Sequence, residues 1–181
     1  MTTYTLPEFF KLMKPRRGRD RALIRKCITG LGLYAAQQAR ADPATPKIAE
    51  LRGLIENLAC YWGLDNVDGD PSAGPAILKE EFLDPFDARI QAVRSGVDIQ
   101  ADILAICRPY VIYGLYRYGA DMAVSMGAMA KDEILSIAGL MKEIAAAWGC
   151  ESATLDNLIS DLETDAPLLE VPEPDAMGEL P

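Results

Sequence analysis

The stretch TPKIAELRGLIENLACYW, residues 45–62, carries the clearest helical pattern in the chain. Its apolar side chains recur three or four residues apart, which places them on one face of an α-helix. Thr45 and Pro46 suit the cap and the first residue of this helix, and Gly63 suits its end. We expect the helix to bury the face made of Ile48, Leu51, Leu54, Ile55, Leu58 and Tyr61.

The same spacing recurs on both sides of this stretch. Residues 20–40 predict a second helix with a buried stripe of Leu23, Ile24, Cys27, Ile28, Leu31 and Tyr34. Further helical segments are expected over about 5–13, 76–83, 84–94, 98–118, 132–148 and 154–162. Asp84 should cap the helix that begins at Pro85, Thr154 should cap the last one, and Pro109 should kink or break the one that contains it.

Strand signals are nearly absent, because no stretch alternates apolar and polar residues for more than a few positions. The sequence therefore predicts an all-α fold, either a helical bundle or an orthogonal helical array of six to eight helices. We expect one helical domain over residues 1–163, with an acidic loop at 64–75, followed by a Pro-rich acidic extended tail over 164–181.

Charge is distributed unevenly along the chain. Residues 1–53 hold eleven Lys and Arg against four Asp and Glu, whereas residues 54–181 hold seven against 23. The basic charge is concentrated in segment 11–26, at the start of a predicted helix, where the helix dipole disfavours cations. Helix stability therefore does not explain it, which leaves a solvated basic face without a specific ligand or a contact for an anionic partner. The predicted partner-binding cations are Lys11, Lys14, Arg16, Arg17, Arg19, Arg21, Arg25 and Lys26.

The tail TDAPLLEVPEPDAMGELP contains four prolines and no Lys or Arg. Apolar side chains are nevertheless spaced through it, as in peptides that dock in an extended form into a partner's groove. We predict partner contacts from Leu168, Leu169, Val171, Met177 and Leu180.

The sequence offers few residues for metal or catalytic chemistry. It has no histidine, its cysteines Cys27, Cys60, Cys107 and Cys150 are widely separated, and we expect these to be four buried thiols. The stretch DNVDGDPSAG, residues 65–74, fails the calcium-loop pattern at the turn glycine and at the final acid, so we interpret it as a connection between helices. We predict no metal and no cofactor.

These observations favour a non-catalytic helical interaction protein, an oligomeric structural or adaptor component of a larger bacterial or viral assembly. It would contact neighbours, or copies of itself, through its basic N-terminal and acidic C-terminal segments. No apolar run approaches the length of about 18–20 residues that crosses a bilayer, and no secretory signal is evident, so we expect a cytoplasmic protein or one within a virion or other assembly made in the cytoplasm.

Two alternatives stay open at this point. The cations of segment 11–26 could bind the phosphates of a nucleic acid, although the acidic remainder of the chain would repel them. A small-molecule-binding domain or an enzyme could instead use the region of Tyr110, Tyr113, Tyr116 and Tyr118, although tyrosines three residues apart on a helix more often pack into a core.

Overall fold

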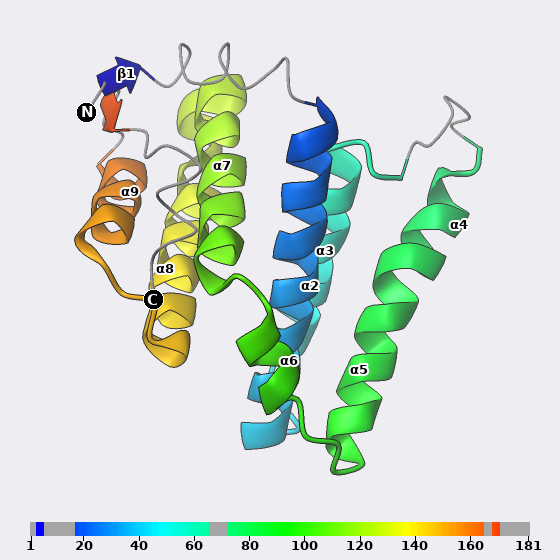
Figure 1. The fold of residues 1–181 in the computed structure, drawn as a ribbon. Helices are drawn as coiled ribbons and strands as arrows, with labels where there is room; N and C mark the ends of the chain where they lie inside the picture. The colour runs from blue at the N-terminus through cyan, green and yellow to red at the C-terminus, as the bar shows by residue number, and fades with distance from the viewer. Residues whose placement is uncertain (1–2, 6–16, 66–71, 165–167, 171–181) are drawn as a thin grey trace. The chain divides into compact units, whose positions relative to one another are not determined.

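The computed structural model of the chain describes residues 3–5, 17–65, 72–164 and 168–170, which are almost entirely helical (Figure 1). The α-helices are α2 (Arg17–Ala41), α3 (Lys47–Tyr61), α4 (Gly74–Leu78), α5 (Asp84–Arg94), α6 (Gln100–Ala105), α7 (Arg108–Met126), α8 (Lys131–Trp148) and α9 (Ala153–Glu163). A π-helical turn η2 (Lys79–Leu83) joins α4 to α5, and a 3₁₀ turn η3 (Gly127–Ala130) joins α7 to α8.

This architecture confirms the predicted all-α class. The described residues form seven helices when the unbroken run from Gly74 to Arg94 is counted as one, within the expected six to eight. Besides the helices, two short strands, β1 (Thr3–Thr5) and β2 (Leu168–Glu170), pair antiparallel, with Tyr4 opposite Leu169. None of the described helices combines the length and the apolar composition needed to cross a membrane.

Internal contacts divide the chain into two compact units. Unit 2 is Arg21–Ile106, and unit 1 consists of Met1–Asp20 together with Cys107–Pro181. The single domain expected over residues 1–163 stays a prediction. The boundary falls at Ile106 and Cys107, where the backbone is extended (ψ of 151° and 91°). A continuous helix would need a hydrogen bond from the nitrogen of Pro109 to the carbonyl of Ala105, and proline has no such N–H, which confirms the predicted break.

In unit 2, α2 buries most of the predicted stripe, including Ile24, Cys27 and Leu31 at 0% exposure. Helix α3 likewise buries Leu51, Ile55 and Leu58. Tyr61 is a correction, because it lies at the last turn of α3 with 43% of its surface exposed. Helical spacing alone placed it on the buried face, but α3 ends there, and the ring lies edge-on to that of Trp62 with the centres 5.9 Å apart.

The run from Gly74 to Arg94 corrects a second prediction. Asp84 does not cap a new helix, because α4 continues into α5 through η2, in which the Asp84 N–H donates to the carbonyl of Lys79 five residues earlier. Pro85 explains the turn: an α-helix would need its missing N–H at the carbonyl of Glu81, and π-type bonding lets the helix pass that position. The Asp84 carboxylate instead accepts a hydrogen bond from Lys79 Nζ at 2.7 Å.

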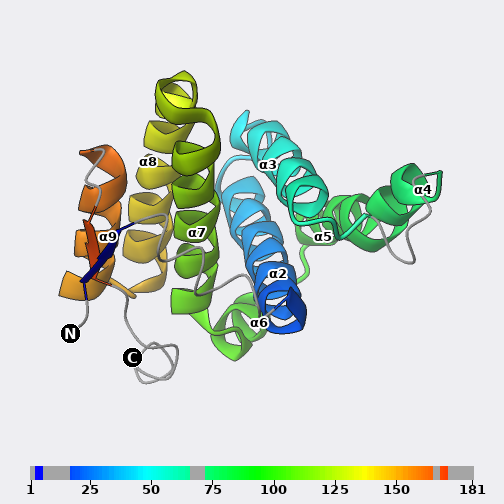
Figure 2. The same cartoon turned by 90° about the horizontal axis from the view of Figure 1, so that it is seen from above.

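Unit 1 is built around α7, α8 and α9, which contact one another in pairs and lie side by side in both views (Figures 1 and 2). Every residue of α7 from Val111 to Ala120 is buried. The predicted face of the last helix is confirmed, since α9 buries Leu155, Leu158, Ile159 and Leu162. Its cap is Ser152, whose Oγ accepts from the Leu155 N–H at 3.2 Å, and not the predicted Thr154, two residues further along.

Two predicted segments fall largely outside the described residues. The helix over 5–13 lies there except for Thr5, which belongs to β1, and the tail lies there except for Thr164 and β2. The stretch at 65–74 does connect two helices, α3 and α4. Its ends are close together, because a Cβ on Gly74 would lie 3.4 Å from the carbonyl oxygen of Asp65.

Candidate functional site

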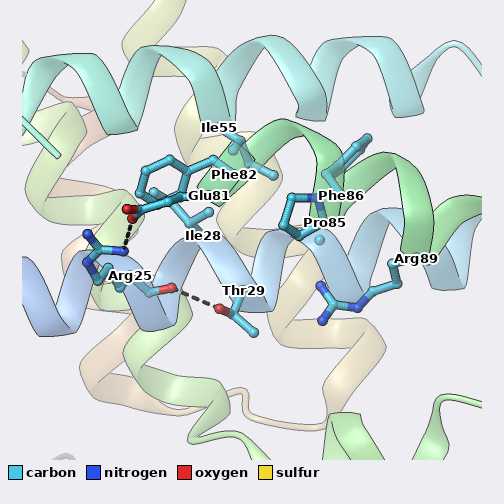
Figure 3. Close-up of a pocket in the computed structure, with 10 residues that line it drawn as sticks. Arg25, Ile28, Thr29, Ile55, Glu81, Phe82, Pro85, Phe86 and Arg89 are labelled. Carbon is cyan, nitrogen blue, oxygen red and sulfur yellow. Dashed lines mark hydrogen bonds and ion pairs between the residues drawn. The ribbon is translucent and has the colours of Figure 1, made fainter. Parts of the chain in front are cut away.

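A pocket of about 130 Å³ lies in unit 2 between α2, α3, η2 and α5 (Figure 3). Its apolar wall is made of buried side chains, Ile28, Ile55, Phe82 and Phe86. Its polar lining consists of Arg25, Thr29, Glu81 and Arg89, and Gly32 and Pro85 complete it. Pockets for cofactors and drug-sized ligands are typically about 300–1,000 Å³, so this one has the size of a single side chain or a small organic acid.

Arg25 contacts two other residues of the pocket. Its Nη1 donates to Glu81 Oε2 at 2.9 Å, and its guanidinium carbon lies 5.2 Å from the centre of the Phe82 ring. Both charged side chains are 44% exposed, so the pair adds at most about 1 kcal/mol to stability. The contact links α2 to η2 and neutralises one end of the pocket.

Arg89 lies at the other end of the pocket and reaches from α5 toward α2 (Figure 3). Arg89 as a residue is partly buried, and it has no hydrogen bond or ion pair with any other residue that the structure describes. It occupies space that Gly32 leaves empty, because a Cβ on Gly32 would lie 2.9 Å from Arg89 Nη1. A partly desolvated cation without a partner is a binding group for an anion.

The neighbouring ion pairs hold the pocket walls in place. Arg52 on α3 donates two hydrogen bonds of 3.0 Å, from Nε and Nη2, to the two carboxylate oxygens of Asp87 on α5. The hydrogen bonding that Arg52 donates to Asp87 raises the pKa of Arg52 further above its ordinary value. Such bidentate pairs have a defined geometry, so this contact sets how α5 lies against α3.

The predicted basic segment is only partly described. Lys11, Lys14 and Arg16 lie outside the described residues, and Arg17 and Arg19 belong to the first turn of α2. Arg21 donates to the carbonyl of Gly63 at a long 3.5 Å, Arg25 pairs with Glu81, and Lys26 is exposed. Two of the predicted partner-binding cations therefore contact residues of unit 2 itself.

The predicted tail residues are also only partly described. Leu168 and Leu169 are in β2, whose backbone pairs with β1, and Val171, Met177 and Leu180 lie outside the described residues. The structure thus brings the two ends of the chain together at β1 and β2, a pairing that no sequence pattern had indicated.

The tyrosine region belongs to the core of unit 1. Tyr113, Tyr116 and Tyr118 are buried, and the rings of Tyr113 and Tyr116 stack with their centres 6.3 Å apart. Burial raises the pKa of Tyr116, whose hydroxyl has no hydrogen-bond partner among the described residues.

The cysteines differ from the expected set of four buried thiols. Cys27 and Cys150 are buried, but Cys107 is partly accessible and Cys60 is exposed at the last turn of α3. Burial raises the pKa of Cys27 to about 12 and also raises that of Cys150. The described residues contain no cluster of three or more Cys, Asp or Glu suited to a metal ion.

Sequence reasoning missed Arg89, although a signal for it exists. Phe82, Phe86 and Arg89 are spaced four and three residues apart, which puts them on one face of a continuous helix. Treating Asp84-Pro85 as a new helix start divided that pattern in two. The residues of α2 that line the same pocket, including Gly32 and Arg25, are more than fifty residues away in sequence.

Comparisons of the chain with protein families, with curated proteins and with solved structures found no match.

Proposed function

We propose that this chain is a non-catalytic helical interaction protein that joins a larger assembly, or copies of itself, through complementary basic and acidic surfaces. The observation that carries the proposal is Arg89, a partly buried cation without a partner among the described residues, in a pocket that suits one acidic side chain. The acidic partner surface would include the C-terminal segment, which has no Lys or Arg after Lys142.

The shape of the pocket supports binding of a protein segment. Interfaces are commonly anchored by single side chains that fill small pockets with apolar walls, and arginine is frequent at such anchors. The pocket combines both features, since Ile28 and Phe86 are buried in its wall and Arg89 lies at its edge.

A second surface supports the same function in unit 1. Large apolar side chains are exposed along the end of α7, the turn η3 and the start of α8: Met126 at 48%, Met129 at 87% and Leu135 at 40%. Methionines adapt their shape to varied partners, and exposed apolar groups near one turn often mark contact surfaces.

The two alternatives receive less support from the described residues. A nucleic acid would have to displace Glu81 from Arg25 and approach a surface with several carboxylates, including Asp84 and Asp87. A substrate for the tyrosine region would have to enter a helix face that is closed by packing.

Sedimentation velocity of the full chain tests the proposal, alone and with proteins that co-purify with it. We expect assembly at low salt that weakens as salt rises, because screening reduces charge–charge contacts. The variant E173Q/D175N/E179Q should assemble less well. The matched control D132N/E133Q/E151Q removes the same charge from exposed acids of unit 1 and should behave like the natural chain.

A monomer at both low and high salt, with and without candidate partners, would contradict the proposal. Fluorescence anisotropy with labelled DNA and RNA at low salt tests the first alternative. Binding that falls steeply with salt and is lost in R16Q/R17Q/R19Q/R21Q would replace the proposed function by nucleic-acid binding.

A further inference from the structure

We infer that the anionic occupant of the Arg89 pocket is the acidic C-terminal segment, residues 171–181, of a second copy of this chain. The inference deepens the proposed function, since it names the two surfaces that meet. It rests on charge complementarity, on the mixed acidic and apolar character of the segment, and on the size of the pocket.

The charges of the two partners match. Segment 171–181 contains three acids, Glu173, Asp175 and Glu179, and no Lys or Arg. In the pocket, Glu81 already neutralises Arg25, so Arg89 is the cation that remains for an incoming carboxylate. A guanidinium binds a carboxylate through two parallel hydrogen bonds, which gives direction as well as charge to the contact.

The apolar parts match as well. Alternate side chains of an extended peptide point to the same side, and one side of this segment would carry Val171, Glu173, Asp175, Met177 and Glu179. Met177 thus has an acid two residues away in either direction. An acid bound to Arg89 would leave a neighbouring apolar side chain beside Ile28 and Phe86, which form the pocket wall.

Arg89 can lie in the pocket in this position because residue 32 is a glycine. The guanidinium lies where a side chain at residue 32 would be, and a methyl group there would be only 2.9 Å from Nη1. The variant G32A therefore shifts Arg89 and leaves the net charge unchanged. It separates the geometry of the pocket from the general attraction between basic and acidic surfaces.

The experiment measures binding of a fluorescent synthetic peptide, residues 171–181, to the full chain carrying E173Q/D175N/E179Q, so that its own segment does not compete. We expect saturable binding that R89Q weakens about tenfold, as loss of a charge-assisted hydrogen-bonded pair should. G32A should weaken it as well. K26Q removes one exposed charge from α2 outside the pocket and should change the dissociation constant less than about twofold.

Folding of each variant is verified by its melting temperature, and R89Q should melt with the parent chain because Arg89 has no partner to lose among the described residues. Absence of saturable binding would overturn the inference. So would equal weakening by R89Q and K26Q, which would show diffuse attraction only.

The outcome is distinguishable from that of the sedimentation test. Salt-dependent assembly that R89Q does not alter would retain the proposed function and refute the pocket as the site of the tail. Peptide binding that depends on Arg89 in a chain that stays monomeric would retain the pocket as a peptide site but overturn the second copy as its occupant, and it would contradict self-assembly.

Discussion

Unit 1 and unit 2 differ in how charged side chains join their helices. In unit 1, α7 is buried at every position from Val111 to Ala120. The unit holds nine Lys and Arg against fifteen Asp and Glu, but only four of these cations lie in residues 107–181. In unit 2, residues 21–106 hold nine against twelve, and ion pairs join segments far apart in sequence. These pairs are Arg25–Glu81, Arg40–Asp98 and Arg52–Asp87.

The ion pairs of unit 2 contribute to the specificity of helix packing more than to stability. Each ion pair of unit 2 is well exposed and is worth about 0–1 kcal/mol, so apolar burial supplies most of the stability in both units. The pairs decide instead which faces of α2, α3 and α5 meet. Among the described residues of unit 2, Lys26 and Arg89 have no local partner. Lys26 is exposed to water, whereas Arg89 is partly buried, so Arg89 indicates a contact outside the unit.

The largest expected effect is the loss of a core leucine from α7. Leu115 is fully buried, so L115A should lower the free energy of unfolding by about 2–5 kcal/mol through lost burial and an unfilled cavity. The control L135A removes a leucine that is 40% exposed in the same unit and should cost much less. Denaturant unfolding measures both variants.

Hydrogen exchange of L115A also tests how independent the two units are. We expect faster amide exchange in residues 107–164, where α7, α8 and α9 contact one another. An equal increase over residues 21–106 would show that both units unfold together, as the single domain predicted from the sequence would.

The next effect concerns Cys27 in α2. Because its folded pKa is about 12 and its unfolded value about 9, the folded state keeps the thiol neutral, and this contribution is present below pH 9 and is lost as pH rises toward 12. By pH 10.5 the natural chain should lose about 2 kcal/mol relative to C27A. Urea titrations of both proteins at pH 8 and pH 10.5 measure this change, and parallel losses would refute the assigned pKa.

Gly32 should show a smaller effect of opposite sign. Alanine is favoured over glycine inside a helix by about 0.8–1 kcal/mol, and the only close obstacle at residue 32 is the flexible end of Arg89. We expect G32A to raise the melting temperature even as it weakens tail binding. The control G63A, where φ is +63°, should instead be destabilising, because alanine disfavours that conformation. A lower melting temperature for G32A would mean that Arg89 cannot move aside.

The smallest effect is expected from the best ion pair of unit 2. A double-mutant cycle of R52Q and D87N should give a coupling energy of about 0.5–1 kcal/mol that declines with added salt. A coupling energy several times larger, or one that salt does not change, would show that this pair contributes stability as well as orientation. Chemical denaturation at two salt concentrations provides the measurement.

Much of the helical framework was predictable from sequence because its cause is local. The buried stripes of α2 and α9 follow from the spacing of their apolar residues. Gly149 ends α8 in the left-handed conformation, which follows from the backbone preference of glycine. Tyr61 shows the limit of this reasoning, since its burial depends on whether another helix reaches the end of α3.

The prolines Pro85 and Pro109 show what local sequence does not decide. Each lies inside an apolar helical pattern, yet the chain breaks before Pro109 and continues past Pro85 through a π turn. At Pro85 the flanking Phe82 and Phe86 are both buried, so tertiary packing stabilises a continuous helix that the proline disfavours.

The sequence by itself determined the helical class, most helix positions and the uneven distribution of charge, because helix periodicity and composition are properties of neighbouring residues. Only the tertiary structure decided which charges are paired. In the sequence, Arg25 is one of the predicted partner-binding cations, but in the structure it pairs with Glu81 of η2. No sequence pattern singled out Arg89, which the structure places against Gly32 of α2. Partners 56 or 57 residues apart carry no shared local pattern, so the candidate site exists only once the helices are packed.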